Sequence, residues 1–64
     1  MGAADGGSAE DDAAVLASLQ GADPLTQAEI AIDTGIKRAA VGVALARLRS
    51  AGKIEKHGWR YKAP

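Results

Sequence analysis

The feature that most constrains this chain is a helix of about two turns whose start and end are both signalled between Thr26 and Gly35. Thr26 is a favourable N-cap residue, and Glu29 follows it by three positions. This spacing predicts a capping box, in which the Thr26 hydroxyl accepts the Glu29 backbone N–H and the Glu29 carboxylate accepts the Thr26 backbone N–H. Gly35 predicts the end of the helix, because glycine adopts the left-handed conformation at little steric cost.

Apolar spacing predicts how this helix packs and which element comes next in the chain. Leu25 precedes the cap and Ile30 occupies the fourth helical position, which fits a hydrophobic staple. A second helical pattern begins directly after the turn, with one buried stripe at Val41, Leu45 and Leu48. The segment 25–48 is therefore predicted to be two helices joined by a tight turn.

Two helices joined by a short turn that contains glycine form the helix-turn-helix pattern. The segment resembles the helix-turn-helix superfamily at a small residue, a turn glycine and four apolar anchors: Ala31, Gly35, Ile30, Ile36, Val41 and Ala44. Each position has a packing reason, since Ala31 lets the helices approach and Gly35 makes the turn.

An additional helix is expected before this segment. Ser8 offers an N-cap, and the acidic residues 10–12 fall in the first turn, where the helix dipole favours carboxylates. Adjacent residues on a helix point in different directions, so we do not expect these acids to bind a metal ion. The buried face of this helix is predicted at Val15, Leu16 and Leu19. Residues 1–8 are expected to be a disordered tail, residues 20–24 to be a turn, and residues 9–64 to be one small domain.

After the stop that Gly52 predicts for the third helix, the apolar period changes from 3.6 to 2. His57-Gly58 predicts a two-residue hairpin turn, which would pair three sets of residues: Lys56 with Trp59, Glu55 with Arg60, and Ile54 with Tyr61. In that register Ile54 and Tyr61 face the core, and Glu55 forms an ion pair with Arg60. The whole pattern resembles the winged helix-turn-helix family: mainly α with a small β-hairpin, three helices plus a wing.

The net charge of zero hides a strong asymmetry along the chain. All eight lysines and arginines follow Ile36, and seven of the eight acidic residues precede it. Residues 1–36 therefore carry seven negative charges, and residues 37–64, with eight basic residues and one acid, carry a net charge of +7. Such asymmetry indicates a basic binding face.

The family resemblance implies double-stranded DNA as the partner, with the third helix in the major groove and the wing on the backbone. Six positions correspond to those that usually read DNA: Lys37, Arg38, Ala39, Gly42, Val43 and Ala46. Of these, Arg38 alone carries the fork that base readout needs. Phosphate contacts are expected from Lys37, Arg49, Lys53, Lys56, Arg60 and Lys62, and from the side chain or backbone N–H of Gln27.

Trp59 has two interpretations that the sequence leaves open. It lies against a sugar–phosphate edge, or it covers the edge of the small core with Lys56 as a cation–π partner. His57 is expected to form a turn rather than to bind a metal ion, because no second ligand is near it in the sequence.

The expected function is DNA binding in transcriptional regulation, in a cytoplasmic or nucleoid-associated intracellular protein. The alternative is a protein-interaction module that uses an exposed surface of Ile32, Val43 and Trp59, with a second copy or another protein as partner. With no cysteine, one histidine and no Gly-rich phosphate loop, we expect neither an enzyme nor a cofactor, metal or small-molecule site. No apolar run approaches the ~20 residues that a membrane span needs.

Overall fold

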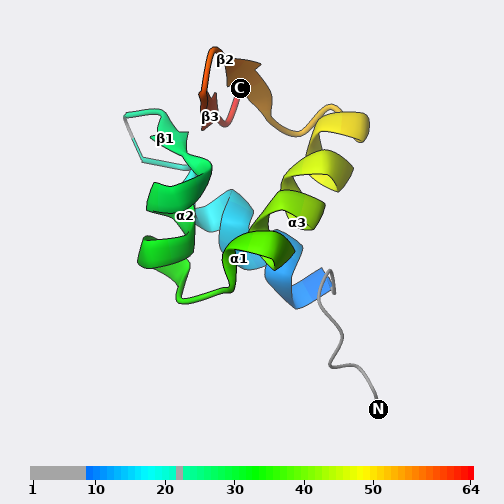
Figure 1. Cartoon of the computed structure of the whole chain (residues 1–64). Helices are drawn as coiled ribbons and strands as arrows, with labels where there is room; N and C mark the ends of the chain where they lie inside the picture. Colours follow the sequence, from blue (N-terminus) through cyan, green and yellow to red (C-terminus); the bar gives the residue numbers. More distant parts are fainter. Residues whose placement is uncertain (1–8, 22) are drawn as a thin grey trace.

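A computed structural model describes residues 9–21 and 23–64 and shows three helices beneath a small sheet (Figure 1). The helices are α1 (Ala9–Ser18), α2 (Gln27–Thr34) and α3 (Arg38–Ser50), and the strands are β1 (Leu25–Thr26), β2 (Glu55–His57) and β3 (Arg60–Lys62). This confirms the predicted fold class. The expected tail, the Ser8 cap and Ala22 of the expected turn lie outside the described residues.

The boundaries of α2 follow the predicted local chemistry. Thr26 Oγ1 accepts the Glu29 backbone N–H at 3.2 Å, and Glu29 Oε1 accepts the Thr26 backbone N–H at 2.8 Å, so the capping box is confirmed. Gly35 ends the helix at φ +76°, in the left-handed region as predicted. The Thr34 hydroxyl donates to the Ile30 carbonyl at 2.8 Å and accepts the Ile36 backbone N–H at 3.2 Å, which ties the turn to the helix end.

The end of α3 is closed by two backbone hydrogen bonds around Gly52, which has φ +74°. The Lys53 N–H donates to the Leu48 carbonyl at 2.9 Å, and the Gly52 N–H donates to the Arg49 carbonyl at 3.0 Å. This is the Schellman arrangement, and it confirms Gly52 as the stop that turns the chain into the wing.

The three helices and the start of the wing share one apolar core. Its buried members are Val15, Leu19, Ile30, Val41, Ala44, Leu45, Leu48 and Ile54. Leu25 and Tyr61 of the sheet pack against this cluster and are partly buried. Leu16, predicted in the buried face of the first helix, is also only partly buried. The core therefore fixes α3 between α1, α2 and the sheet.

The sheet has three antiparallel strands in the order β1-β3-β2, so the prediction of a two-stranded hairpin was incomplete. The predicted hairpin register was wrong: the turn lies one position later, so each cross-strand partner is shifted by two residues. Three pairs form instead between the strands of the hairpin: Glu55 with Lys62, Lys56 with Tyr61, and His57 with Arg60. The turn residues are consequently Gly58 and Trp59. Gly58 adopts φ +67°, which the first central position of a tight hairpin turn requires and glycine supplies readily.

Among the described residues, no helix is long and apolar enough to cross a membrane.

Candidate nucleic-acid interface

The surface of α3 divides into four stripes with different roles. Val41, Ala44, Leu45 and Leu48 form the buried stripe that holds the helix against the rest of the domain. On the opposite stripe Ala39, Val43 and Ala46 are exposed, and Val43 keeps 48% of its surface accessible. These small side chains allow a large partner to approach the helix backbone closely.

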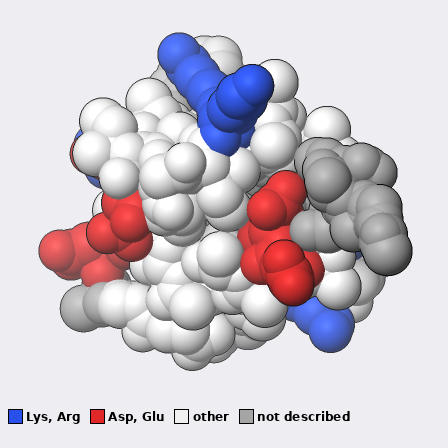
Figure 2. Space-filling view, turned by 90° about the horizontal axis from the view of Figure 1, so that it is seen from below, with Lys and Arg blue, Asp and Glu red and all other residues white. Residues whose placement is uncertain are grey.

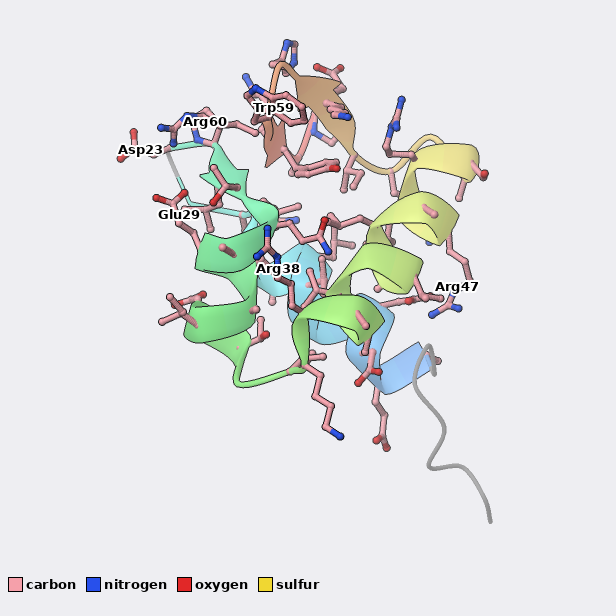
Figure 3. The ribbon with its side chains drawn as sticks, viewed as in Figure 1. Asp23, Glu29, Arg38, Arg47, Trp59 and Arg60 are labelled. Carbon is pink, nitrogen blue, oxygen red and sulfur yellow. The ribbon has the colours of Figure 1, made fainter. Side chains whose placement is uncertain are left out.

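A third stripe of α3, at Arg38, Gly42 and Arg49, follows the helical repeat at i, i+4 and i+11 on the side toward α2. At a rise of about 1.5 Å per residue, Arg38 and Arg49 stand roughly 16 Å apart along the helix axis. Figure 3 shows the Arg38 side chain directed from the start of α3 toward α2. Both arginines are exposed, so this side of α3 has a positive charge near each end.

Gln27, the first residue of α2, lies against this stripe. Its Nε2 donates a hydrogen bond to the backbone carbonyl of Arg38 at 3.0 Å. One donor of the amide that was expected to reach a phosphate is therefore engaged within the protein, and the side chain ties the start of α2 to the start of α3.

The basic side chains differ in whether an acidic side chain neutralises them. Six form no ion pair in the described part of the chain: Lys37, Arg38, Arg49, Lys53, Lys56 and Lys62. All six belong to the predicted set, and they lie at the start of α3, at its end, and on the wing. Their charges are therefore available to an anionic partner.

Arg47 faces the other way, on the α3 stripe toward α1. Its Nη2 lies 2.6 Å from Asp12 Oδ1 and its Nε lies 3.0 Å from Asp12 Oδ2, so the pair is bidentate. The hydrogen bonds to Asp12 raise the pKa of the Arg47 guanidinium above its ordinary value. Arg47 joins α3 to α1, consistent with its absence from the predicted DNA-contacting residues.

Arg60 of β3 contacts Glu29 of α2, with Nη1 3.5 Å from Oε1, and the predicted Glu55–Arg60 ion pair was wrong. Glu55 instead contacts the His57 ring, with Oε1 3.0 Å from Nε2. Two strand pairings account for the difference. The hairpin register sets Arg60 opposite His57 rather than Glu55, and the pairing of β3 with β1 sets it opposite Thr26, beside the start of α2. Figure 3 shows Arg60 directed toward the side of the molecule that holds Asp23 and Glu29.

Glu29 is held in its ionised form. The hydrogen bond from the Thr26 backbone N–H, followed by the nearby Arg60 charge, lowers the pKa of the Glu29 carboxyl below its ordinary value. Partial removal from water acts in the opposite direction but is outweighed. The carboxylate therefore serves both the capping box and the contact with Arg60.

Trp59 and Lys56 lie together at the end of the wing. Trp59 is 82% exposed, which contradicts one of the two interpretations that the sequence left open, a cover for the edge of the core. The cation–π contact was predicted correctly, because Lys56 Nζ lies 5.7 Å from the centroid of the Trp59 ring and 5.9 Å from that of Tyr61. The wing therefore presents an accessible indole beside a lysine ammonium group.

The end of the molecule opposite the sheet is a mixture of uncharged and acidic surface. Figure 2 shows acidic side chains there in two separate groups, with basic side chains at the top of the view and at its lower right. In the described residues no group of three His, Cys, Asp or Glu side chains could hold a metal ion. The basic residues without ion pairs on α3 and the wing are therefore the strongest candidate for a functional surface.

A family model described as winged helix-turn-helix DNA-binding matches residues 12–55, which include all three helices except the start of α1, together with the beginning of the wing. Comparison with curated proteins found no match, and neither did comparison with solved structures.

Proposed function

The chain belongs to the winged helix-turn-helix DNA-binding family, and from this premise we propose that it binds double-stranded DNA with α3 in the major groove and residues 53–62 on the sugar–phosphate backbone. We assign this binding to transcriptional regulation, the role that the resemblance to winged-helix regulators implies.

The observation that carries the binding mode is the distribution of basic side chains without ion pairs. Lys37 and Arg38 at the start of α3, Arg49 near its end, and Lys53, Lys56 and Lys62 on the wing have no acidic partner among the described residues. The basic residue on the α1 side of α3 is already neutralised by an acid. Phosphate groups would compensate these six free charges and release counterions, which favours binding at low salt.

Base readout in this proposal is limited to the start of α3. Arg38 carries the planar fork that recognises guanine, and it is exposed. Ala39, Val43 and Ala46 offer only methyl groups, which contact thymine methyls without forming hydrogen bonds. We therefore expect modest sequence discrimination and an affinity dominated by phosphate contacts.

Arg60 and Gln27 contribute less directly in this mode. Arg60 can contact a phosphate only by sharing or leaving Glu29, which lies 3.5 Å away. Gln27 contributes its remaining amide donor or its position at the α2 N-terminus, where the helix dipole favours an anion.

The experiment is an NMR titration of the isotope-labelled domain with a short duplex of random sequence at low and moderate salt. We expect amide shifts at residues 37–43, near Gln27 and across residues 53–62, and these should weaken as salt rises. The logarithm of the binding constant should fall with the logarithm of salt at about −0.9 per phosphate neutralised. Salt-independent shifts confined to α1 would contradict the proposal.

A second candidate function, protein interaction, is favoured by the surroundings of Ile32. This side chain is 83% exposed and lines a shallow concavity of about 470 Å³ together with three acids, Asp23, Glu29 and Asp33. The negative charges of these acids would repel DNA. The same acids, with an exposed apolar side chain among them, suit a basic protein segment. Val43 and Trp59 are also exposed, but they lie on other elements, α3 and the wing.

A further inference from the structure

The indole of Trp59 is a large apolar group that the fold leaves in water. Its exposed fraction of 82% contrasts with Tyr61, two residues later, which is partly buried against the core. Among the described residues, the indole forms no hydrogen bond, and its one ring contact is with the ammonium of Lys56. Neither core packing nor a hydrogen bond accounts for a tryptophan at this position.

The backbone that carries Trp59 is held in place. Trp59 is the second residue of a tight turn, and the next residue begins β3, which pairs with β1 on one side and β2 on the other. A tryptophan has only two side-chain torsions, so little conformational entropy is lost when a ligand covers its ring. The wing therefore presents a nearly preformed aromatic surface.

The neighbours of Trp59 indicate the chemistry of its ligand. Residues directly opposite in an antiparallel pair lie on the same face of the sheet. Lys56 therefore lies on the same face as Tyr61 and Leu25, and this face packs against the helices. The Lys56 ammonium lies 5.7 Å from the Trp59 ring centroid and carries no ion pair. An aromatic surface beside a free positive charge matches a nucleotide, which offers a flat base and an adjacent phosphate.

A base within an intact duplex is stacked on its neighbours and cannot offer its face to an indole. An unpaired base can, and stacking on aromatic side chains is a principal mode of binding single strands. We propose that Trp59 and Lys56 form a stacking site for an unpaired base, so that the domain prefers a duplex that ends in, or is interrupted by, a single-stranded segment. This inference rests on the proposed function, because α3 would hold the adjoining duplex.

The test compares two DNAs that share a duplex of about fifteen base pairs, which exceeds the roughly ten spanned by the 34 Å long axis of the domain. One is blunt and the other carries a short single-stranded extension. We expect the extended DNA to bind about tenfold more tightly, within the range for stacking one base. Because Trp59 is the only tryptophan, its fluorescence should be quenched by the extended DNA and much less by the blunt duplex.

Variants separate stacking from other contributions. Trp59→Ala should bind both DNAs with the same affinity, within about twofold, and Trp59→Phe should keep most of the tenfold preference. Ile32→Ala, which truncates another highly exposed apolar side chain, should behave as the wild type. Circular dichroism checks that each variant is folded.

Each outcome has a distinct meaning. The stacking site would be overturned, with duplex binding left intact, if the wild type bound both DNAs with equal affinity. It would also be overturned if Trp59→Ala lost the same factor of affinity for both DNAs. Binding of neither DNA by the wild type would overturn the proposed function and this inference with it.

Discussion

The side-chain amide of Gln27 joins the first residue of α2 to the first residue of α3, with Nε2 3.0 Å from the Arg38 carbonyl oxygen. The same nitrogen lies 2.9 Å from the position that a Cβ on residue 42 would occupy. Glycine at position 42 therefore leaves room for the amide. Gln27, Arg38 and Gly42 together set how α2 meets α3, and so how a bound duplex would meet both helices.

A double-mutant cycle should reveal this dependence. Gln27→Ala removes the hydrogen bond and should lower the free energy of unfolding by about 1 kcal/mol. Gly42→Ala should gain about 1 kcal/mol of helix propensity but displace the amide, so its net effect should be close to zero. In the Gly42→Ala background, Gln27→Ala should then cost little. Urea unfolding of the four proteins measures the coupling, and strictly additive effects would show that the two residues act independently.

Two isoleucines on α2 should differ sharply in their effect on stability. Ile30 is fully buried and Ile32 is 83% exposed. Ile30→Ala should cost about 2–5 kcal/mol through lost burial and the cavity left behind. A domain of this size has a total stability of roughly 3–10 kcal/mol, so this variant should be close to unfolding at room temperature. Ile32→Ala should change stability by no more than about 0.5 kcal/mol. Thermal unfolding monitored by circular dichroism would measure the stability of both variants. Similar melting temperatures for Ile30→Ala and Ile32→Ala would contradict the assigned core.

The helices were predictable because their boundaries depend on neighbouring residues. A threonine followed three positions later by glutamate sets the start of α2, and Gly35 and Gly52 set the ends of α2 and α3. Each of these effects acts within a few residues of the chain. The core was predictable for a similar reason, since helical periodicity alone selects the buried stripe of α3.

The sheet was less predictable because its pairing joins residues far apart in the sequence. A two-residue segment before α2 forms β1, and nothing in the spacing of Leu25 and Thr26 distinguishes a strand from a cap. The register depends on whether Gly58 takes the first or the second central position of the turn. The His57-Gly58 pattern favoured the second position, whereas Gly58 occupies the first. Because the turn lies one position later, Arg60 is opposite His57 rather than Glu55, and the pairing of β3 with β1 places it near Glu29.

The candidate site could be proposed from the sequence, but the ion-pair partners of its side chains could not. Charge segregation along the sequence identified the basic half of the chain. The sequence does not state which of these charges an acid would neutralise, because Arg47 and Asp12 are separated by 35 positions and meet only when α1 packs on α3. The exposure of Trp59 likewise depends on the register of the hairpin.

Glu29 should make folding sensitive to acid. Its pKa is lowered in the folded state, chiefly by the hydrogen bond from the Thr26 N–H and then by Arg60. The stabilisation is therefore fully present above the pKa of the unfolded chain, which is about 4.3, and is lost as the pH falls through the lower folded value. Urea midpoints measured between neutral and acidic pH should show this decline.

Glu29→Gln is the matched control for this titration, because a glutamine can still complete the capping box but carries no charge. The difference in stability between the wild type and Glu29→Gln should shrink as the pH falls below the ordinary range for glutamate. A difference that stays constant over this range would mean that ionisation of Glu29 does not stabilise the fold.

DNA binding should respond differently to substitution at Arg38 and on the wing. Arg38→Ala should cost about 1–3 kcal/mol on a preferred sequence and reduce the preference itself, because Arg38 is the only base-reading fork at the start of α3. The Lys53→Ala/Lys62→Ala pair should weaken binding to all sequences alike and reduce the salt slope by about 2.

Arg47→Ala is the matched control. It removes the same charge from α3 as Arg38→Ala, but on the side that Asp12 already neutralises, so it should leave the affinity for DNA nearly unchanged. Fluorescence anisotropy with two unrelated duplexes at several salt concentrations measures all three. An Arg47→Ala variant as weak as Arg38→Ala would mean that the α1 side of α3 contacts the DNA and that the proposed orientation is reversed.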